Sequence, residues 1–279
     1  MTMNILTDTA YIPQQKTCLS KQYGAYGKVN FGNNKADYDE SSNDKSTNDG
    51  ISKAIILGIT QKIISVVTNL CGNKLLRGKE FTSKENVDKV VQTMKKNNKL
   101  STEVHFLDET NVETLKKRFP YLEKNLDIVA EGKNAFFTEN GNIAVAPKSK
   151  PSLILHELGH ATNHNNKKLM YGLQKLRIAG MIAPTALMAV NSILGENQDG
   201  KENFIERHAG KIGFLSYLPT IIEEGVASIR GIKAAKKCFG NSVNLKPLKQ
   251  NYFFAWMTYV LAGVATGIAS RLAISEKKS

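Results

Sequence analysis

The stretch Pro151-Ser152-Leu153-Ile154-Leu155-His156-Glu157-Leu158-Gly159-His160 decides how this chain is interpreted. An apolar run leads into two histidines that are separated by three residues. On an α-helix, positions i and i+4 lie on one face, one turn apart, so both imidazoles can bind a single metal ion. Glu157 is rotated from His156 by about 100° around the helix axis. Its carboxylate can therefore take a proton from water at the metal instead of binding the metal itself.

A catalytic metal ion needs a third protein ligand and one open coordination position. A third histidine in the pattern HExxHxxGxxH is excluded, because Asn163 and Asn166 occupy the positions that would have to be Gly and His. The later segment Ile222-Glu223-Glu224-Gly225-Val226-Ala227-Ser228 offers two glutamates in otherwise apolar surroundings. A carboxylate there is costly unless it meets a cation. Either Glu223 or Glu224 could therefore be the third metal ligand.

The HELGH segment followed by the distant Glu224-Gly225-Val226-Ala227 resembles the gluzincin zinc metallopeptidases. Within them it is most similar to the membrane-embedded HtpX and CAAX prenyl protease type. The resemblance implies that zinc is held by His156, His160 and Glu224 and that Glu157 is the catalytic base. It favours Glu224 over Glu223, because only Glu224 is followed by Gly and has Ala three residues later.

Upstream, Asn134-Ala135-Phe136 resembles the edge-strand motif of thermolysin and of the membrane gluzincins. By that resemblance, Asn134 and the backbone of Ala135 bind the main chain of a peptide substrate. An extended peptide can pair with an exposed sheet edge in this way. The chain departs from the membrane family at Ser228, which stands where that family has an aspartate that orients a ligand histidine. A hydroxyl can accept the same hydrogen bond more weakly.

The donor that stabilises the transition state is not fixed by the motifs, and His208, Tyr217 and Arg230 remain candidates. His164 is eight residues beyond His156, about 12 Å along a helix axis, which is too far to bind the same ion. A histidine at position 105 falls within a predicted strand and is expected to have a structural role.

The formal net charge of +13 points to an anionic partner. Its distribution favours a membrane surface over nucleic acid, because a run of basic residues without an acidic one, from Arg230 to Lys249, leads into an apolar stretch. The three cysteines are widely separated and predict neither a disulfide framework nor a cysteine metal site. No cleavable signal peptide is expected at the N-terminus.

The apolar stretch Tyr252–Ser270 holds 19 residues without a formal charge, close to the length that crosses a bilayer. Aromatic residues crowd its first half, as in an interfacial belt, and Gly263 and Gly267 form a GxxxG packing face. Ile178–Gly195 is more ambiguous. Because all zinc ligands must meet at one ion, the number of crossings between His160 and Glu224 must be even. The segment 178–222 is therefore either an apolar hairpin, with 212–222 as its return, or a set of buried helices.

Six segments are predicted. Residues 1–50 are polar and expected to be disordered. Residues 51–77 form an amphipathic helix, 78–177 the first part of the catalytic domain, 178–222 the hairpin or buried helices, 223–250 the glutamate helix and a basic linker, and 251–279 a transmembrane helix with a basic tail. Within 78–177, we expect helices over 82–97 and 112–122, a strand over 102–107, and a hairpin of 134–138 and 142–146 around Asn140-Gly141.

The sequence therefore predicts an α+β fold with a zincin-like metallopeptidase domain. Its parts are a small mixed sheet with an edge strand, an HExxH helix and a glutamate helix, together with membrane-associated helices. The expected function is that of a membrane-associated zinc endopeptidase acting on protein or peptide substrates. The expected location is a bacterial-type cytoplasmic membrane, in contact with lipid and with the site facing the cytoplasm. The alternatives are a soluble or peripheral regulatory zinc protease and a non-catalytic membrane interaction protein on the same scaffold. No nucleic-acid partner is expected, and the oligomeric state stays open.

Overall fold

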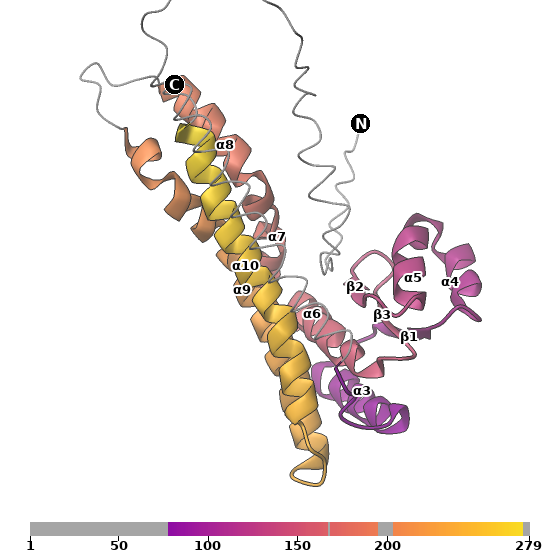
Figure 1. Ribbon diagram of the computed structural model, residues 1–279. Helices are drawn as coiled ribbons and strands as arrows, with labels where there is room; N and C mark the ends of the chain where they lie inside the picture. The colour runs from indigo at the N-terminus through magenta and orange to yellow at the C-terminus, as the bar shows by residue number, and fades with distance from the viewer. Residues whose placement is uncertain (1–77, 167, 195–202, 276–279) are drawn as a thin grey trace, which may run out of the picture.

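The structure is a computed structural model that describes residues 78–166, 168–194 and 203–275. The predicted polar region 1–50, the amphipathic helix 51–77 and the end of the basic tail lie outside the described residues. The described part consists of a smaller region that carries the sheet and a long arm of helices (Figure 1). The fold is mostly helical, with one small mixed sheet.

The sheet has three strands in the order β1-β3-β2, where β1 is Glu103–Leu107, β2 is Phe136–Thr138 and β3 is Ile143–Pro147. β1 runs parallel to β3, and β2 runs antiparallel to it. The turn between β2 and β3 contains Gly141 with φ +87° and Asn142 with φ +49°. This left-handed region favours Gly and Asn, which explains why the Asn-Gly signal produced a hairpin here. The predicted hairpin and the strand at 103–107 are confirmed.

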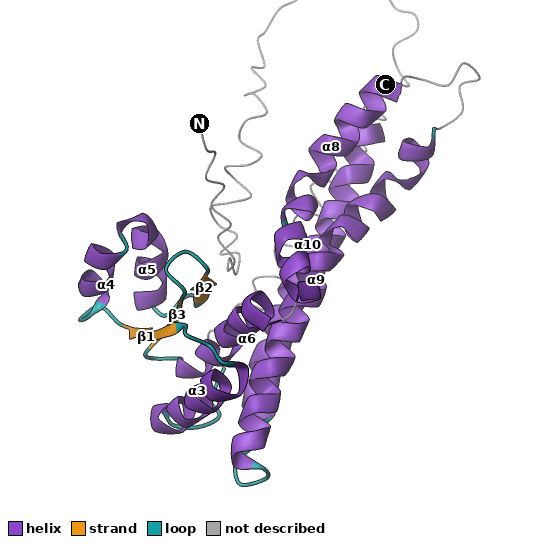
Figure 2. Cartoon of the chain, turned by 180° about the vertical axis from the view of Figure 1, so that it is seen from behind, coloured by secondary structure: helices purple, strands orange, loops and turns teal. Residues whose placement is uncertain are grey.

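Helices cover both faces of this sheet (Figures 1 and 2). Side chains of successive strand residues point to opposite faces, so Phe137 belongs to the core shared with the HELGH helix, whereas Phe136 belongs to the other core. The helices of the first core include α3 (Lys84–Asn98) and α6 (Ile154–Asn166), and those of the second are α4 (Val112–Arg118) and α5 (Glu123–Ala130).

The helix predictions in this region are correct in position but not in every boundary. α3 forms where a helix was expected, although the Ser83 side chain makes no capping hydrogen bond. α4 ends at Arg118, four residues earlier than predicted, and a short 3-10 turn (Pro120–Leu122) follows it. The residue before a proline is disfavoured in the helical region, which stops α4 before Pro120. α5 was not anticipated.

The arm is built from α8 (Ile178–Leu194), α9 (Phe204–Phe239) and α10 (Lys246–Ser275), and α7 (Lys168–Leu176) leads into it. α8 and α9 are antiparallel, since Gly180 lies against Tyr217 while Asn203 donates a hydrogen bond to Asn191 at the other end. α9 and α10 are also packed side by side along most of their length (Figure 1).

The predicted boundary at residue 222 is wrong, because α9 runs without a break through Glu223 and Glu224. The segment 212–222 and the glutamate helix are one element of 36 residues, about 54 Å long. Pro219 lies inside this helix. A proline removes one backbone hydrogen bond but does not end a helix whose faces are held by tertiary packing on both sides.

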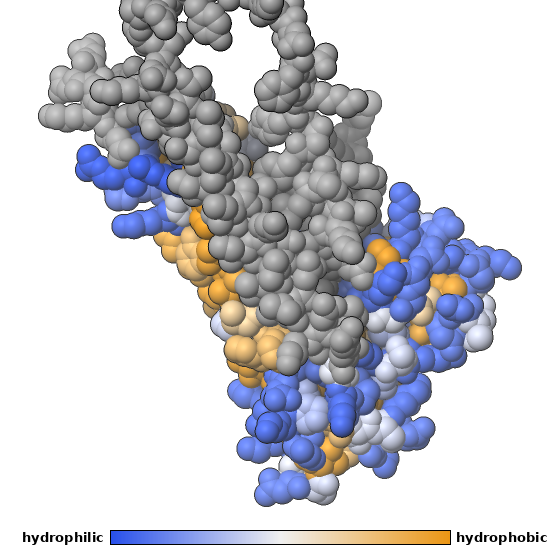
Figure 3. Space-filling model, in the orientation of Figure 1, coloured by the Kyte–Doolittle hydropathy of each residue, from blue (hydrophilic) through white to orange (hydrophobic). Residues whose placement is uncertain are grey.

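α10 is long and apolar enough to cross a membrane by length and composition, and a third of its most apolar window is buried. The bent pair α7 and α8 passes the same test when taken together. A continuous apolar band lies on the visible face of the arm, with hydrophilic residues beyond both of its ends (Figure 3). The large apolar side chains that α9 and α10 expose include Leu215, Ile222, Ile229, Phe253 and Val264.

Candidate metal centre

The HELGH helix and the glutamate helix touch through their backbones. A Cβ atom on Gly159 would lie 2.4 Å from the carbonyl oxygen of Ala227, and one on Gly231 would lie 3.0 Å from that of Leu155. The two contacts are one helical turn apart on each helix, and the missing side chains of the two glycines let α6 and α9 approach more closely than larger residues would permit. This approach brings His156, His160 and the glutamates of α9 together, although more than sixty residues separate them in the sequence.

His156, His160 and Glu224 form a group that could hold a metal ion. The distance between the two Nε2 atoms is 2.9 Å, and Glu224 Oε2 lies 3.1 Å from His156 Nε2 and 3.5 Å from His160 Nε2. Ligand atoms bound tetrahedrally at about 2.0–2.1 Å from zinc are about 3.3 Å apart. The three distances bracket that value, so the donor set is compatible in size with a tetrahedrally bound metal ion.

The three residues are largely shielded from water, but the site is not sealed. The side chains of His160 and Glu224 are each 1 % exposed, whereas that of His156 is 13 % exposed. The ligand group thus has one side that solvent can reach. Such an opening is what an open coordination position for water requires.

Each histidine has a partner on its other ring nitrogen. In the tautomer that leaves both Nε2 atoms free to bind a metal, His156 Nδ1–H donates to Ser228 Oγ over 3.1 Å and His160 Nδ1–H donates to Glu223 Oε1 over 2.8 Å. Such bonds fix the ring orientation and tautomer of a metal ligand. Ser228 therefore lies where the sequence placed an orienting partner, and Glu223, the competing ligand candidate, lies behind His160 instead.

Glu223 is the centre of a buried polar network. Its Oε1 also accepts hydrogen bonds from Asn163 Nδ2 over 2.8 Å and from Gln174 Nε2 over 2.9 Å. Arg177 bridges the two carboxylates, with Nη1 3.3 Å from Glu223 Oε2 and Nη2 2.5 Å from Glu224 Oε1. Arg177 thus neutralises one oxygen of Glu224 and leaves Oε2 directed at the histidines. Sequence reasoning missed Arg177 and Gln174, which carry no motif of their own.

Glu157 lies beside the ligand group and is 3 % exposed. Its Oε2 is buried and makes no hydrogen bond within the part of the chain that the structure describes. Burial raises the pKa of this carboxyl above its ordinary value, against the opposing effect of the two histidines. A buried carboxyl with an unused oxygen is suited to accept a proton from a molecule that enters the site.

The charge balance at the centre favours a cation. Although burial acts to lower the pKa of His160, the carboxylates of Glu223 and Glu224 raise it well above the usual value. The two carboxylates therefore favour positive charge beside the His160 ring. A divalent metal ion would supply that charge.

The three candidate donors for the transition state have different positions. His208 packs on Phe204 near the start of α9, about 24 Å along the helix from Glu224, which rules it out. Arg230 donates through Nε to Asn163 over 2.7 Å and so lies behind the site. Tyr217 interacts electrostatically with Glu224 and Arg177, as does Tyr259 of α10, which sequence reasoning did not select.

The predicted substrate edge lies beside the HELGH helix. Among the described residues, β2 forms one edge of the sheet, and its Phe137 ring is 6.0 Å from the ring of His164 on α6. Asn134 and Ala135 precede β2 and are 7 % and 1 % exposed. The Ala135 side chain is part of the core, so any contact with a substrate would have to come from its backbone.

The two remaining histidines of interest are not in the ligand group. His164 Nδ1 pairs with Glu139 Oε2 over 3.1 Å at the hairpin turn, and its ring contacts Tyr171. His105 in β1 lies 3.2 Å from Glu103.

Three comparisons with known proteins found no matching family model, curated protein or solved structure.

Proposed function

We propose that this protein is a membrane-associated zinc-dependent endopeptidase of the gluzincin type. The observation that carries the proposal is the convergence of three atoms within 4.8 Å of one another, beside Glu157 of α6: His156 Nε2 and His160 Nε2 from α6, and Glu224 Oε2 from α9. The donor set is that of a zinc site with two histidines and one carboxylate, and such sites keep a position open for water or substrate.

Zinc, when bound, supplies the Lewis acidity that polarises a peptide carbonyl and lowers the pKa of water. Proton transfer and the orientation of the ligands depend on side chains of the protein. Glu157 accepts a proton from the attacking water and passes it to the leaving amine, a transfer that its buried carboxyl can make without first breaking a hydrogen bond at Oε2. Ser228 and Glu223 keep His156 and His160 in one orientation throughout.

The position of β2 supports an extended peptide as the substrate. An edge strand next to the HELGH helix can add a peptide as a further strand and hold its scissile bond over the ligand group. Asn134 and the backbone of Ala135, at the start of β2, are the proposed contacts to the substrate main chain. This role is inferred from their place in the fold and from the family resemblance.

The packing of α10 supports a site at a membrane surface. Tyr252, at the start of the apolar stretch, donates to the backbone oxygen of Ser152 and packs its ring 5.5 Å from that of His156. Tyr252 and Tyr259 are buried, so only part of the expected aromatic belt faces outward. The site thus lies level with Tyr252, within two helical turns of Lys246 and Lys249 at the basic start of α10. By the positive-inside rule we propose that this end faces the cytoplasm.

The ion pair between Arg177 and Glu224 favours a second candidate, a non-catalytic scaffold in which this network is only structural. In that case the carboxylate is already neutralised by the guanidinium, and no metal is needed to stabilise the buried charges. A soluble or peripheral zinc protease, in which the apolar helices contact partners instead of lipid, is separated from the main proposal by whether purification requires detergent.

The test is the zinc content and peptidase activity of the full chain and of Glu157→Gln. We expect about one zinc per chain in both proteins, and cleavage of an unstructured protein substrate by the wild type alone. Glu113→Gln is the matched control, because it makes the same carboxylate-to-amide replacement at an exposed position on α4, and it should retain activity. A wild type that binds no zinc would refute the proposal, and zinc binding without cleavage would favour the scaffold.

A further inference from the structure

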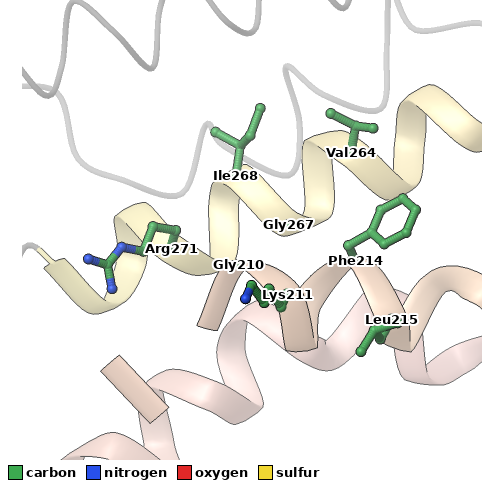
Figure 4. A pocket seen from close by; sticks show the side chains of 8 residues that line it. All are labelled: Gly210, Lys211, Phe214, Leu215, Val264, Gly267, Ile268 and Arg271. Carbon is green, nitrogen blue, oxygen red and sulfur yellow. The ribbon is translucent and has the colours of Figure 1, made fainter. Parts of the chain in front are cut away.

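An apolar groove lies between α9 and α10, away from the metal centre. Its volume is about 540 Å³, within the range of about 300–1,000 Å³ that ligand clefts occupy. Gly210 is about 21 Å along α9 from Glu224, so the groove is not part of the proposed active site. Its lining consists of Gly210, Lys211, Phe214 and Leu215 from α9, with Val264, Gly267, Ile268 and Arg271 from α10 (Figure 4).

The floor of the groove is made by glycine. A Cβ atom on Gly267 would lie 2.8 Å from the backbone oxygen of Gly210, and one on Gly210 would lie 3.3 Å from that of Gly267. The two helices are therefore in backbone contact there, and larger side chains stand on either side. Gly267 is the second glycine of the GxxxG pattern, so that pattern packs α10 against α9 of the same chain.

Positive charge gathers at one end of the groove. Lys211 and Arg271 lie toward the same end, and Phe214 and Val264 lie toward the other (Figure 4). Arg271 also donates to the backbone oxygen of Glu206, whose own carboxylate accepts the Asn203 N–H in a capping box. The shape thus combines an apolar trough with two cations at its mouth, which is complementary to an anionic amphiphile.

We propose that this groove binds one acyl chain of an anionic phospholipid from the bilayer, with the phosphate at Lys211 and Arg271. Lipid is the occupant that the surroundings favour, because α10 is the helix that is long and apolar enough to cross a membrane. Arg271 directly follows the uncharged stretch that ends at Ser270, so the two cations lie where a headgroup would be. Lys and Arg side chains at a headgroup can donate charge-assisted hydrogen bonds to its phosphate.

The length of the groove agrees with this occupant. From Val264 to Arg271 the helix rises about 10 Å. One leaflet of a bilayer contributes about 15 Å of hydrocarbon. The groove therefore holds the upper two thirds of one acyl chain below a phosphate at the cations. The same proposal explains why apolar side chains stay exposed here: Leu215 is 55 % and Val264 40 % exposed.

The experiment measures phospholipid binding to the full-length protein in detergent, by native mass spectrometry and by the rise in melting temperature. Phosphatidylglycerol and phosphatidylcholine with identical acyl chains are the two probes. We expect the anionic lipid to bind more tightly, and Lys211→Gln to weaken it about fivefold, the loss of one basic contact of about 1 kcal/mol. Arg271 is not the residue to change, because its bond to the α9 backbone would be lost as well.

Two matched controls make the result decisive. Lys124→Gln removes the same charge from an exposed position on α5, away from the arm, and should leave binding unchanged. Val264→Trp fills the groove and should reduce binding of the anionic lipid, whereas Phe253→Trp, at an exposed position elsewhere on α10, should not. Equal affinity for both lipids, equal loss in Lys211→Gln and Lys124→Gln, or unchanged binding in Val264→Trp would overturn the proposal.

Discussion

Gly159→Ala should separate the two helices that hold the candidate metal ligands. The added methyl carbon would lie 2.4 Å from the carbonyl oxygen of Ala227 and 2.8 Å from its Cα. Ordinary contact begins at 3.4 Å, so α6 and α9 must move apart by about 1 Å. Both obstructing atoms belong to the backbone, and no side-chain rotation can relieve the clash.

A shift of this size exceeds what a metal site tolerates. Ligand distances in such sites hold to within about 0.2 Å, while His156 and His160 move with α6 and Glu224 stays with α9. We expect the apparent zinc affinity to fall at least about tenfold. The free energy of unfolding should also fall by about 1–3 kcal/mol, even though alanine is a better helix former than glycine by about 1 kcal/mol.

The assay is competition for zinc with a chromophoric chelator, together with thermal unfolding with and without zinc. Gly172→Ala is the control, because a Cβ on this α7 glycine would meet no atom of the described residues within 4 Å. It should leave zinc affinity unchanged and stabilise the protein slightly, through helix propensity alone. If Gly159→Ala binds zinc as tightly as the wild type, then Glu224 is not a ligand or the backbone contact between the helices is not required.

Three further variants test the surroundings of the site. Ser228→Ala removes the 3.1 Å hydrogen bond to His156, so zinc affinity should fall about tenfold in the same chelator assay, without loss of the fold in circular dichroism. Arg177→Gln leaves Glu224 without its 2.5 Å partner and should destabilise the zinc-free protein by about 3–5 kcal/mol. Zinc should then raise the melting temperature of this variant by more than it raises that of the wild type. If zinc does not raise it, a purely structural network is favoured. Glu80→Gln tests linkage: burial raises the pKa of the Glu80 carboxyl, so the folded state binds its proton more tightly than the unfolded state does. Ionisation of Glu80 therefore destabilises the wild type as the pH rises from the ordinary pKa of 4.5 through the raised pKa. The melting temperature of Glu80→Gln minus that of the wild type should increase from pH 4 to neutral pH. A difference that does not change with pH would contradict this.

Features that depend on neighbouring residues followed from the sequence. The spacing of His156 and His160 places both on one helical face wherever that helix packs. The Asn140-Gly141 pair produced the hairpin because glycine at 141 adopts a φ of +87° without strain. The length and apolar character of Tyr252–Ser270 were sufficient to mark α10 as a candidate membrane helix. In each case the determining forces act within one turn or one strand pair.

Features that depend on the rotation and contact of whole helices needed the tertiary structure. Glu223 and Glu224 are neighbours on α9, and which of them faces the histidines is decided by how α9 is rotated against α6. The backbone contacts at Gly159 and Gly231 fix that rotation. Arg177 carries no motif, and only the path of the chain from α7 to α8 brings its guanidinium to both carboxylates.

The sequence by itself predicted a helix able to bind a metal ion, a candidate base on it and, by resemblance, Glu224 as the candidate third ligand. Only the tertiary structure brought Glu224 Oε2 to the histidines, placed Glu223 against the other side of His160, and buried Tyr252 and Tyr259. The physical reason is the range of the interactions. Periodicity is local and can be read from adjacent residues, whereas the pairing of surfaces more than sixty residues apart depends on close packing of side chains along both helices.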